Sequence, residues 1–169
     1  NANVIGIFLG SLLIAMLAQI SIHIPFSPVP ITGQTIGVLL VGGILGSRKG
    51  LLSVATYISE GALGLPVFAE MSAGLPVLLG PTGGYIISFI PAVLFIGYLT
   101  EQNFTKNIIP SFISCILATF LILVLGTLFL SLFFGLKHSF MIGFYPFIVV
   151  GIIKSFISAI IITTYKKLS

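Results

Sequence analysis

Long apolar runs make up most of the chain, and polar or Gly- and Pro-rich stretches separate them. A transmembrane helix needs ~20 apolar residues to cross the hydrocarbon core of a bilayer. The first run and the last three are close to that length or exceed it, and the second and third are shorter. The six runs cover residues 4–22, 33–46, 50–61, 83–99, 108–133 and 144–165. We therefore expect an all-α membrane protein with six transmembrane helices in a single domain, residues 1–169.

The second and third runs are joined only by Ser47, Arg48 and Lys49. They could form a re-entrant pair or two separate spans that extend into their flanking loops. A re-entrant pair would bury both cations at membrane depth, which costs a few kcal/mol for each charge. We therefore expect two spans, with these charges in water.

Two of the connections have unusual compositions. Residues 23–32 hold three prolines, which predicts a rigid, extended connector. Residues 64–85 combine five glycines and three prolines with Leu, Val, Phe and Met. Such a long loop can form neither a long helix nor a freely solvated coil, and we interpret it as a lid over a pocket; an ordered cap over helix ends is the structural alternative. Residues 134–143 are expected to form a short third loop at the same end.

The composition supports membrane insertion. Hydrophobic residues make up 57% and charged residues 6% of the chain, and the mean hydropathy is +1.27. A soluble domain carries about a quarter charged residues. Aspartate is absent, the acidic residues are Glu60, Glu70 and Glu101, and Cys115 lies inside an apolar run. The net charge of +4 is thus no sign of nucleic-acid binding.

The cations predict the orientation. Six spans place both termini on one side, and cytoplasmic loops of membrane proteins are enriched in Lys and Arg. Lys137 is the one loop cation expected on the opposite side. The side of the termini collects Arg48, Lys49, Lys106, Lys166 and Lys167. We therefore expect cytoplasmic termini, with the connector, the long loop and residues 134–143 on the outer face.

Lys154 differs from the other cations because it lies within an apolar helix, about eight residues beyond Pro146. At 1.5 Å per residue it would be about 12 Å below the outer end. An ionisable group at this depth indicates a functional site, although snorkelling or a structural ion pair is the alternative. We expect Lys154 to contact an anionic or carbonyl-bearing solute.

Further candidates lie at the outer end. Gln34 and Thr35 open the second run and can bind a ligand or cap the helix. Glu70, in the long loop, is either a solvated charge or a polar group of the pocket. The remaining candidates open the fourth run, where a helix N-terminus offers unpaired N–H groups and glycines allow a close approach; they are Thr82, Gly83, Gly84 and Tyr85.

The sequence argues against several other functions. The GPTGGY stretch lacks the GK[ST] ending of a P-loop, which predicts no nucleotide hydrolysis by this chain. His23, His138 and Cys115 do not show metal-ligand spacing, and there is no GxSxG elbow. The sequence shows neither a ring of charges nor a carbonyl filter, so it does not predict a channel. An enzyme and a resident cofactor or metal are therefore not expected.

Three motifs carry a family resemblance. They are IPFSPVPITGQT (residues 24–35), GALGLPVFA (residues 61–69) and LLGPTGGY (residues 78–85). In this order they resemble the BioY family, the biotin-binding substrate-capture (S) components of energy-coupling factor (ECF) transporters. The resemblance implies a bundle of six helices that binds biotin beneath the first, third and fifth loops. It also implies a transmembrane coupling subunit and two cytoplasmic ATPases, which hydrolyse ATP, in the bacterial cytoplasmic membrane.

The resemblance also assigns residues. In the family, small residues of the first helix dock the coupling subunit; the residues of that type here are Gly6, Gly10, Ser11 and Ala15. The sixth helix commonly reads PFxPGDxxK, with the aspartate and lysine at the ligand. PFIVVGIIK (residues 146–154) keeps the lysine but has Gly151 in place of the aspartate. Glu70 is a candidate to compensate for this change.

The predicted pocket suits biotin. Phe68, Met71 and Leu79 would line an apolar pocket for the bicyclic body, with a few polar groups for the urea and the carboxylate. The main alternative is a self-contained facilitator for a small organic solute, which would work without ATPases. An intramembrane enzyme is a weaker alternative, because it would need a nucleophile or a metal site.

Overall fold

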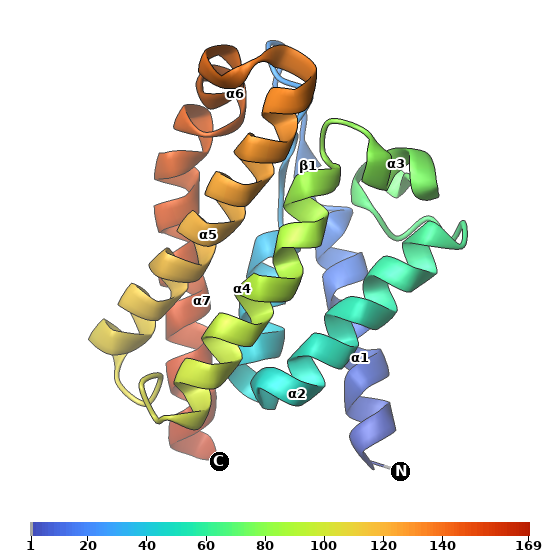
Figure 1. The fold of residues 1–169 in the computed structure, drawn as a ribbon. Coiled ribbons are helices and arrows are strands. Elements are labelled where there is room, and N and C mark those ends of the chain that lie inside the picture. Colours follow the sequence, from blue (N-terminus) through green and yellow to red (C-terminus); the bar gives the residue numbers. More distant parts are fainter. Residues whose placement is uncertain (1) are drawn as a thin grey trace.

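The computed structural model describes residues 2–169 as a bundle of helices (Figure 1). Four stretches of the described chain are long and apolar enough to cross a membrane: Gln34–Ala62, Gly83–Glu101, Ile108–Phe134 and Leu136–Leu168. The elements in chain order are α1 (Ala2–Ala18), β1 (Ser21–Ile22), β2 (Ile31–Thr32), α2 (Gln34–Ala62), η1 (Ala69–Met71), α3 (Leu75–Leu79), α4 (Gly83–Glu101), α5 (Ile108–Phe134), α6 (Leu136–Gly143), η2 (Tyr145–Phe147) and α7 (Ile148–Leu168).

Helix α2 contains both the second and the third predicted spans. It reverses at Gly46, whose φ of 87° and ψ of 179° are not helical. Glycine adopts positive φ without steric cost, so it is the residue suited to this bend. A Cβ built on Gly50 would lie 3.2 Å from the Cα of Gly42, so the two arms touch beside the bend. Two packed helical arms therefore occupy this stretch, and their assignment as two spans rather than a re-entrant pair stays a prediction.

Helix α4 packs against the bend of α2. A Cβ at Gly97 would lie 2.5 Å from the backbone N and Cα of Ser47, so the two backbones are in direct contact. Glu101, at the end of α4, accepts hydrogen bonds from the N–H and the hydroxyl of Ser47, at 2.9 and 2.7 Å. In a bilayer, where lipid tails are as apolar as the helices, such close backbone contacts stabilise helix association.

The two ends of the bundle differ in their content. The α2 bend, the loop after α4, the start of α1 and the end of α7 lie together in the lower part of Figure 1. The β1–β2 connector, α3 and α6 lie at the opposite end. This division agrees with the expected grouping of loops, and we call the second end the outer end.

Several boundaries differ from the prediction. Helix α1 ends at Ala18 instead of residue 22, because Ser21 and Ile22 pair with Thr32 and Ile31 in an antiparallel ladder. The Pro-rich connector is thus a short hairpin and is not helical, as expected. Of residues 134–143, expected to be a loop, Phe134 ends α5 and residues 136–143 form α6 after a turn at Gly135. Glycines and prolines limit the helices of the long loop to η1 and α3, of three and five residues.

The contact at the α2 bend yields a prediction. Gly97→Ala should lower the unfolding free energy by about 1–3 kcal/mol, because the new methyl group meets backbone that cannot rotate away. Gly6→Ala is the matched control, since its Cβ would lie 4.0 Å from the side chain of Leu45, an ordinary contact. Thermal unfolding of the detergent-purified variants measures both, and equal melting temperatures would contradict the prediction.

Candidate functional site

An outer cavity of about 140 Å³ lies beneath the connector and the long loop. Five of the residues expected at a ligand site line it together with Pro28, Val29, Pro30 and Ile86: Gln34, Phe68, Glu70, Thr82 and Tyr85. The first motif, the long loop and the start of α4, far apart in sequence, therefore meet at one place. The lining is apolar with a few polar groups, as in small-molecule sites.

An inner cavity of about 60 Å³ lies deeper in the bundle. Lys154 and Gly151 of α7 line it, together with Thr35 of α2. The two cavities share Val29, Pro30, Gln34 and Tyr85 in their walls. Lys154 and the residues of the long loop thus belong to two neighbouring compartments.

A buried chain of hydrogen bonds forms part of the wall between these compartments. The Thr32 hydroxyl donates to Gln34 Oε1 at 3.1 Å, and Gln34 Nε2 donates to the Tyr57 hydroxyl at 2.7 Å. Tyr57 in turn donates to the carbonyl of Val67 at 2.8 Å. Gln34 therefore holds the connector, α2 and the long loop together, and its amide already has partners within the protein.

Lys154 lies in the inner cavity with its side chain partly buried. Its Nζ donates to the carbonyl of Thr32 at 3.1 Å. The residues that line this cavity include no Asp or Glu. An ammonium group has three N–H donors, so one neutral carbonyl leaves donors for a ligand. The geometry supports the prediction that this lysine meets a solute.

The long loop is fixed to the bundle by Phe68 and Gln19. The Phe68 ring is fully buried and packs edge-on against Tyr57, with 5.6 Å between the ring centres. Gly61 makes room for the ring, since a Cβ there would lie 2.1 Å from Phe68 Cζ. Gln19 donates from Nε2 to the Phe68 carbonyl at 3.0 Å and accepts at Oε1 from the Met71 N–H at 2.9 Å. The sequence reasoning missed Gln19, although an amide inside an apolar run was a usable signal.

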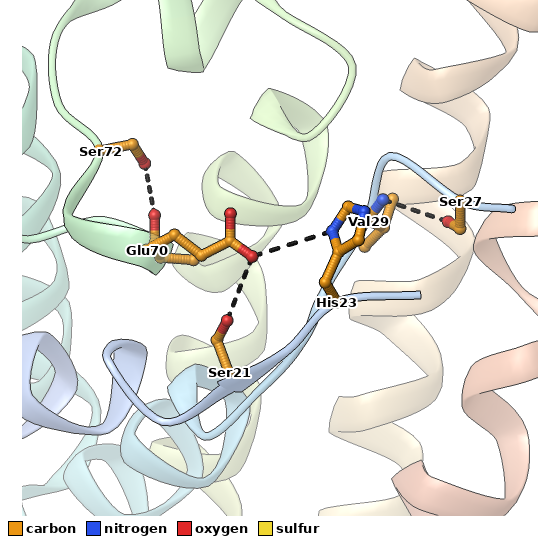
Figure 2. Close-up of polar contacts among 7 residues, drawn as sticks. Ser21, His23, Ser27, Val29, Glu70 and Ser72 are labelled. Atoms are coloured by element: carbon orange, nitrogen blue, oxygen red, sulfur yellow. Dashed lines mark hydrogen bonds and ion pairs between the residues drawn. The ribbon is translucent and has the colours of Figure 1, made fainter. Parts of the chain in front are cut away.

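Glu70 contacts the connector (Figure 2). Its Oε1 accepts a hydrogen bond from Ser21 at 3.3 Å and lies 3.9 Å from His23 Nδ1. Both side chains of the Glu70–His23 pair are more than half exposed, so this contact contributes little to stability. Glu70 lines the outer cavity and Lys154 the inner one. The hypothesis that Glu70 compensates beside Lys154 therefore finds no support in the described contacts.

Ser27 organises the tip of the connector. Its hydroxyl accepts from the Val29 N–H at 3.1 Å, the turn drawn on the right of Figure 2. The same hydroxyl donates to the carbonyl of Ile142 in α6 at 2.6 Å. The connector is therefore held between α6 on one side and the long loop on the other.

The start of α4 differs from the expectation of free N–H groups. The N–H groups of Gly83 and Tyr85 donate to the carbonyls of Gly80 and Thr82. A Cβ at Gly84 would lie 2.2 Å from the Cβ of Phe129, so this glycine lets α4 approach α5 and does not line either cavity. The structure thus gives Gly84 a packing role.

Two of the three residues predicted to form the apolar wall lie elsewhere in the structure. Met71 is 67% exposed and Leu79 is 70% exposed, and neither lines the cavities. Only Phe68 of the three contributes to the wall. Hydropathy identifies such residues as apolar but does not tell which way a loop side chain points.

Tyr85 joins three helices. Its hydroxyl donates to the carbonyl of Gly143 in α6 at 2.6 Å and lies 3.3 Å from the Thr127 hydroxyl in α5. The side chain of Tyr85 contributes to the walls of both cavities. Tyr85 therefore forms part of the cavity walls, and its hydroxyl already has hydrogen-bond partners within the protein.

Gly151 lies between the inner cavity and an apolar groove of α5 and α7. It lines both, as does Thr119. A Cβ at Gly151 would lie 3.1 Å from Thr119 Cγ2. Because Gly151 has no side chain, α5 and α7 lie close together here. For the same reason the cavity has no acid one helical turn from Lys154.

The small residues of α1 face inward. A Cβ at Gly10 would lie 2.5 Å from the Ser53 hydroxyl, and Ser11, 1% exposed, donates to the Glu60 carboxylate. Gly6 faces Leu45 of α2, and Ala15 packs against the hydrophobic core. Gly10 and Ser11 are therefore buried in the α1–α2 interface, whereas Gly6 and Ala15 are only partly buried, and the role of these four residues as a docking face stays a prediction.

Three comparisons place the chain among known proteins. The family model described as "BioY family" matches residues 1–169. The chain is 39% identical to "Biotin transporter BioY" of Thermotoga maritima over 87% of this chain and 86% of the relative. It is 40% identical to "Probable biotin transporter BioY" of Pyrococcus horikoshii over 85% and 83%. The solved structure of "the S-component for biotin from an ECF-type ABC transporter" superposes with a TM-score of 0.90 at 27% identity, covering 98% of this chain and 91% of that one.

The contacts of Gln19 generate a prediction about the long loop. Gln19→Leu removes both hydrogen bonds to residues 68–71, which should raise amide exchange at Met71 about tenfold, the effect of losing one to two net hydrogen bonds. Gln102→Leu, the same change at the other end of the bundle, is the control. Hydrogen–deuterium exchange measured by mass spectrometry tests this. Unchanged exchange in the loop would show that its other contacts, such as the packing of Phe68 and the Tyr57–Val67 hydrogen bond, hold it without Gln19.

Proposed function

The chain belongs to the BioY family, and we propose that it is the substrate-binding S component of an ECF-type biotin uptake transporter. The matches to biotin transporters and the likeness to a biotin S component support this function. The chain itself contributes two adjoining cavities at its outer end, closed by the connector and the long loop. The observation that carries the proposal is the partly buried Lys154, which has no acid in its cavity.

The charge of Lys154 favours an acceptor-bearing ligand. A buried charge without a charged partner is unfavourable, so a ligand oxygen that accepts its hydrogen bonds contributes more than a surface contact. Biotin offers a ureido oxygen and a carboxylate. The apolar walls at Val29, Phe68 and Ile86 match its carbon skeleton. Gln34, Thr82, Tyr85 and Glu70 are proposed as neighbours of the ligand in the outer cavity.

Gly151 changes the polarity of the site relative to the aspartate expected in the family. No acid lines the inner cavity, so a ligand N–H there would have to pair with a hydroxyl or a carbonyl oxygen. Glu70 offers an acceptor in the outer cavity instead. We therefore propose that the inner cavity takes the acceptor atoms of the ligand.

Energy coupling is assigned to partner subunits. The sequence has no P-loop, so we propose that a transmembrane coupling subunit and two cytoplasmic ATPases drive uptake. The protein would lie in the cytoplasmic membrane with both termini inside. The end of the bundle that carries the α2 bend holds more cations than the outer end, which supports this orientation.

A first prediction concerns the ligand. Lys154→Met should raise the Kd for biotin at least tenfold, equivalent to about 1.4 kcal/mol, because the variant keeps an unbranched side chain one atom shorter and loses the charge. Lys166→Met, at the opposite end of α7, should leave the Kd unchanged. Calorimetry of the detergent-purified proteins measures both. Wild-type affinity in Lys154→Met would contradict the role of this lysine.

A second prediction separates the S component from a self-contained facilitator. Proteoliposomes that contain this chain alone should bind biotin but show no uptake into their lumen, since the energy-coupling subunits are missing. Uptake of radiolabelled biotin by vesicles, with and without an unlabelled excess, measures this. Saturable equilibration of biotin across the membrane without any ATPase would favour the facilitator.

A further inference from the structure

Thr35 has a buried hydroxyl with no partner. It is the second residue of α2, where no preceding helical turn offers a carbonyl for its proton. Its Oγ1 is closed to solvent and makes no hydrogen bond within the described part of the chain. Leaving a buried hydroxyl unpaired is unfavourable, and such groups in native proteins call for an explanation.

The position of Thr35 distinguishes it from the other unpaired hydroxyls. Among the described residues, Ser111, Ser139 and Thr163 also have buried hydroxyls without partners. None of the three lines the inner cavity, whereas Thr35 lines it together with Lys154. The residue that carries the unpaired hydroxyl and the residue that carries the ammonium group therefore line the same small cavity.

The surrounding acceptors are already used. The Thr32 carbonyl accepts from Lys154, and the Thr32 hydroxyl and the Gln34 amide bond to each other and to Tyr57. With no acidic residue in the lining, the inner cavity holds donors that its own walls do not satisfy. A ligand oxygen that accepts hydrogen bonds would satisfy these donors.

We infer that Thr35 and Lys154 together form a two-donor site for one oxygen atom of the ligand. The Thr35 hydroxyl and a Lys154 N–H both donate to this oxygen, which is either a carboxylate or a ureido oxygen. This inference rests on the proposed function, and it adds a binding residue and the chemistry of the bound atom. It also explains why a threonine hydroxyl stays unpaired at the start of α2.

The test removes one hydroxyl and leaves the shape of the side chain. Thr35→Val should raise the Kd for biotin about five- to tenfold, and Thr35→Ser should restore it, because serine keeps the donor. Thr163→Val, the same change at an unpaired hydroxyl outside the cavities, should have no effect on binding. Neither valine variant loses a protein hydrogen bond, so both should melt at or above the wild-type temperature.

Ligand analogues identify the bound oxygen. Calorimetry is run with biotin, its methyl ester and the analogue that carries sulfur in place of the ureido oxygen, for wild type, Thr35→Val, Lys154→Met and the double variant. If the ureido oxygen is bound, Thr35→Val weakens the ester as it does biotin and leaves the sulfur analogue unaffected. If the carboxylate is bound, Thr35→Val weakens the sulfur analogue as it does biotin, and weakens the ester less, because the ester offers only a neutral carbonyl oxygen. In either case the loss in the double variant is smaller than the product of the single losses.

Two results would overturn the inference while the proposed function stands. One is a wild-type Kd for biotin in Thr35→Val. The other is an equal loss for all three ligands, which would mean that Thr35 shapes the cavity without donating to the ligand. Failure of the folded wild-type protein to bind any of the three would reject the proposed function, and the inference with it.

Discussion

The outer end of this protein depends on one buried chain of hydrogen bonds, from Thr32 through Gln34 and Tyr57 to the Val67 carbonyl. Away from water each of these groups must find a partner within the protein, so the chain tolerates little displacement. It sets the connector against α2 and places the long loop over Tyr57. Phe68 can then enter the space at Gly61. The walls of both cavities are consequences of this arrangement, since Gln34 belongs to each.

Close backbone contacts hold the rest of the bundle. Gly42, Gly50 and Gly97 bring the two arms of α2 and helix α4 together around the bend. Gly84 and Gly126 do the same between α4 and α5, where Gly126 lies against the ring of Tyr85. In a bilayer these contacts replace the hydrophobic drive that packs soluble helices. The glycines of the long loop, which the sequence assigns to a lid over a pocket, thus serve partly for packing, as Gly84 does against Phe129.

This division explains how much the sequence could predict. Apolar runs located the spans to within a few residues, because a bilayer demands length and hydropathy, and the three motifs located the residues that meet at the outer cavity. The direction in which a side chain points could not be predicted in the same way. Hydropathy does not tell that Met71 and Leu79 point outward or that Ser11 points toward Glu60. The contacts of Gln19 join residues about fifty positions apart, and no local pattern reports such a pairing.

The two charges of the site are separated by the same wall that organises it. Glu70 faces the outer cavity and is held by Ser21 and His23, whereas Lys154 reaches only a neutral carbonyl in the inner cavity. No ion pair between Glu70 and Lys154 is found among the described residues, and Gln19, Gln34 and Ser27 hold the connector and the long loop in place. Under the proposed function, a ligand oxygen that accepts hydrogen bonds from Lys154 would stabilise this arrangement of the connector and the long loop by mass action.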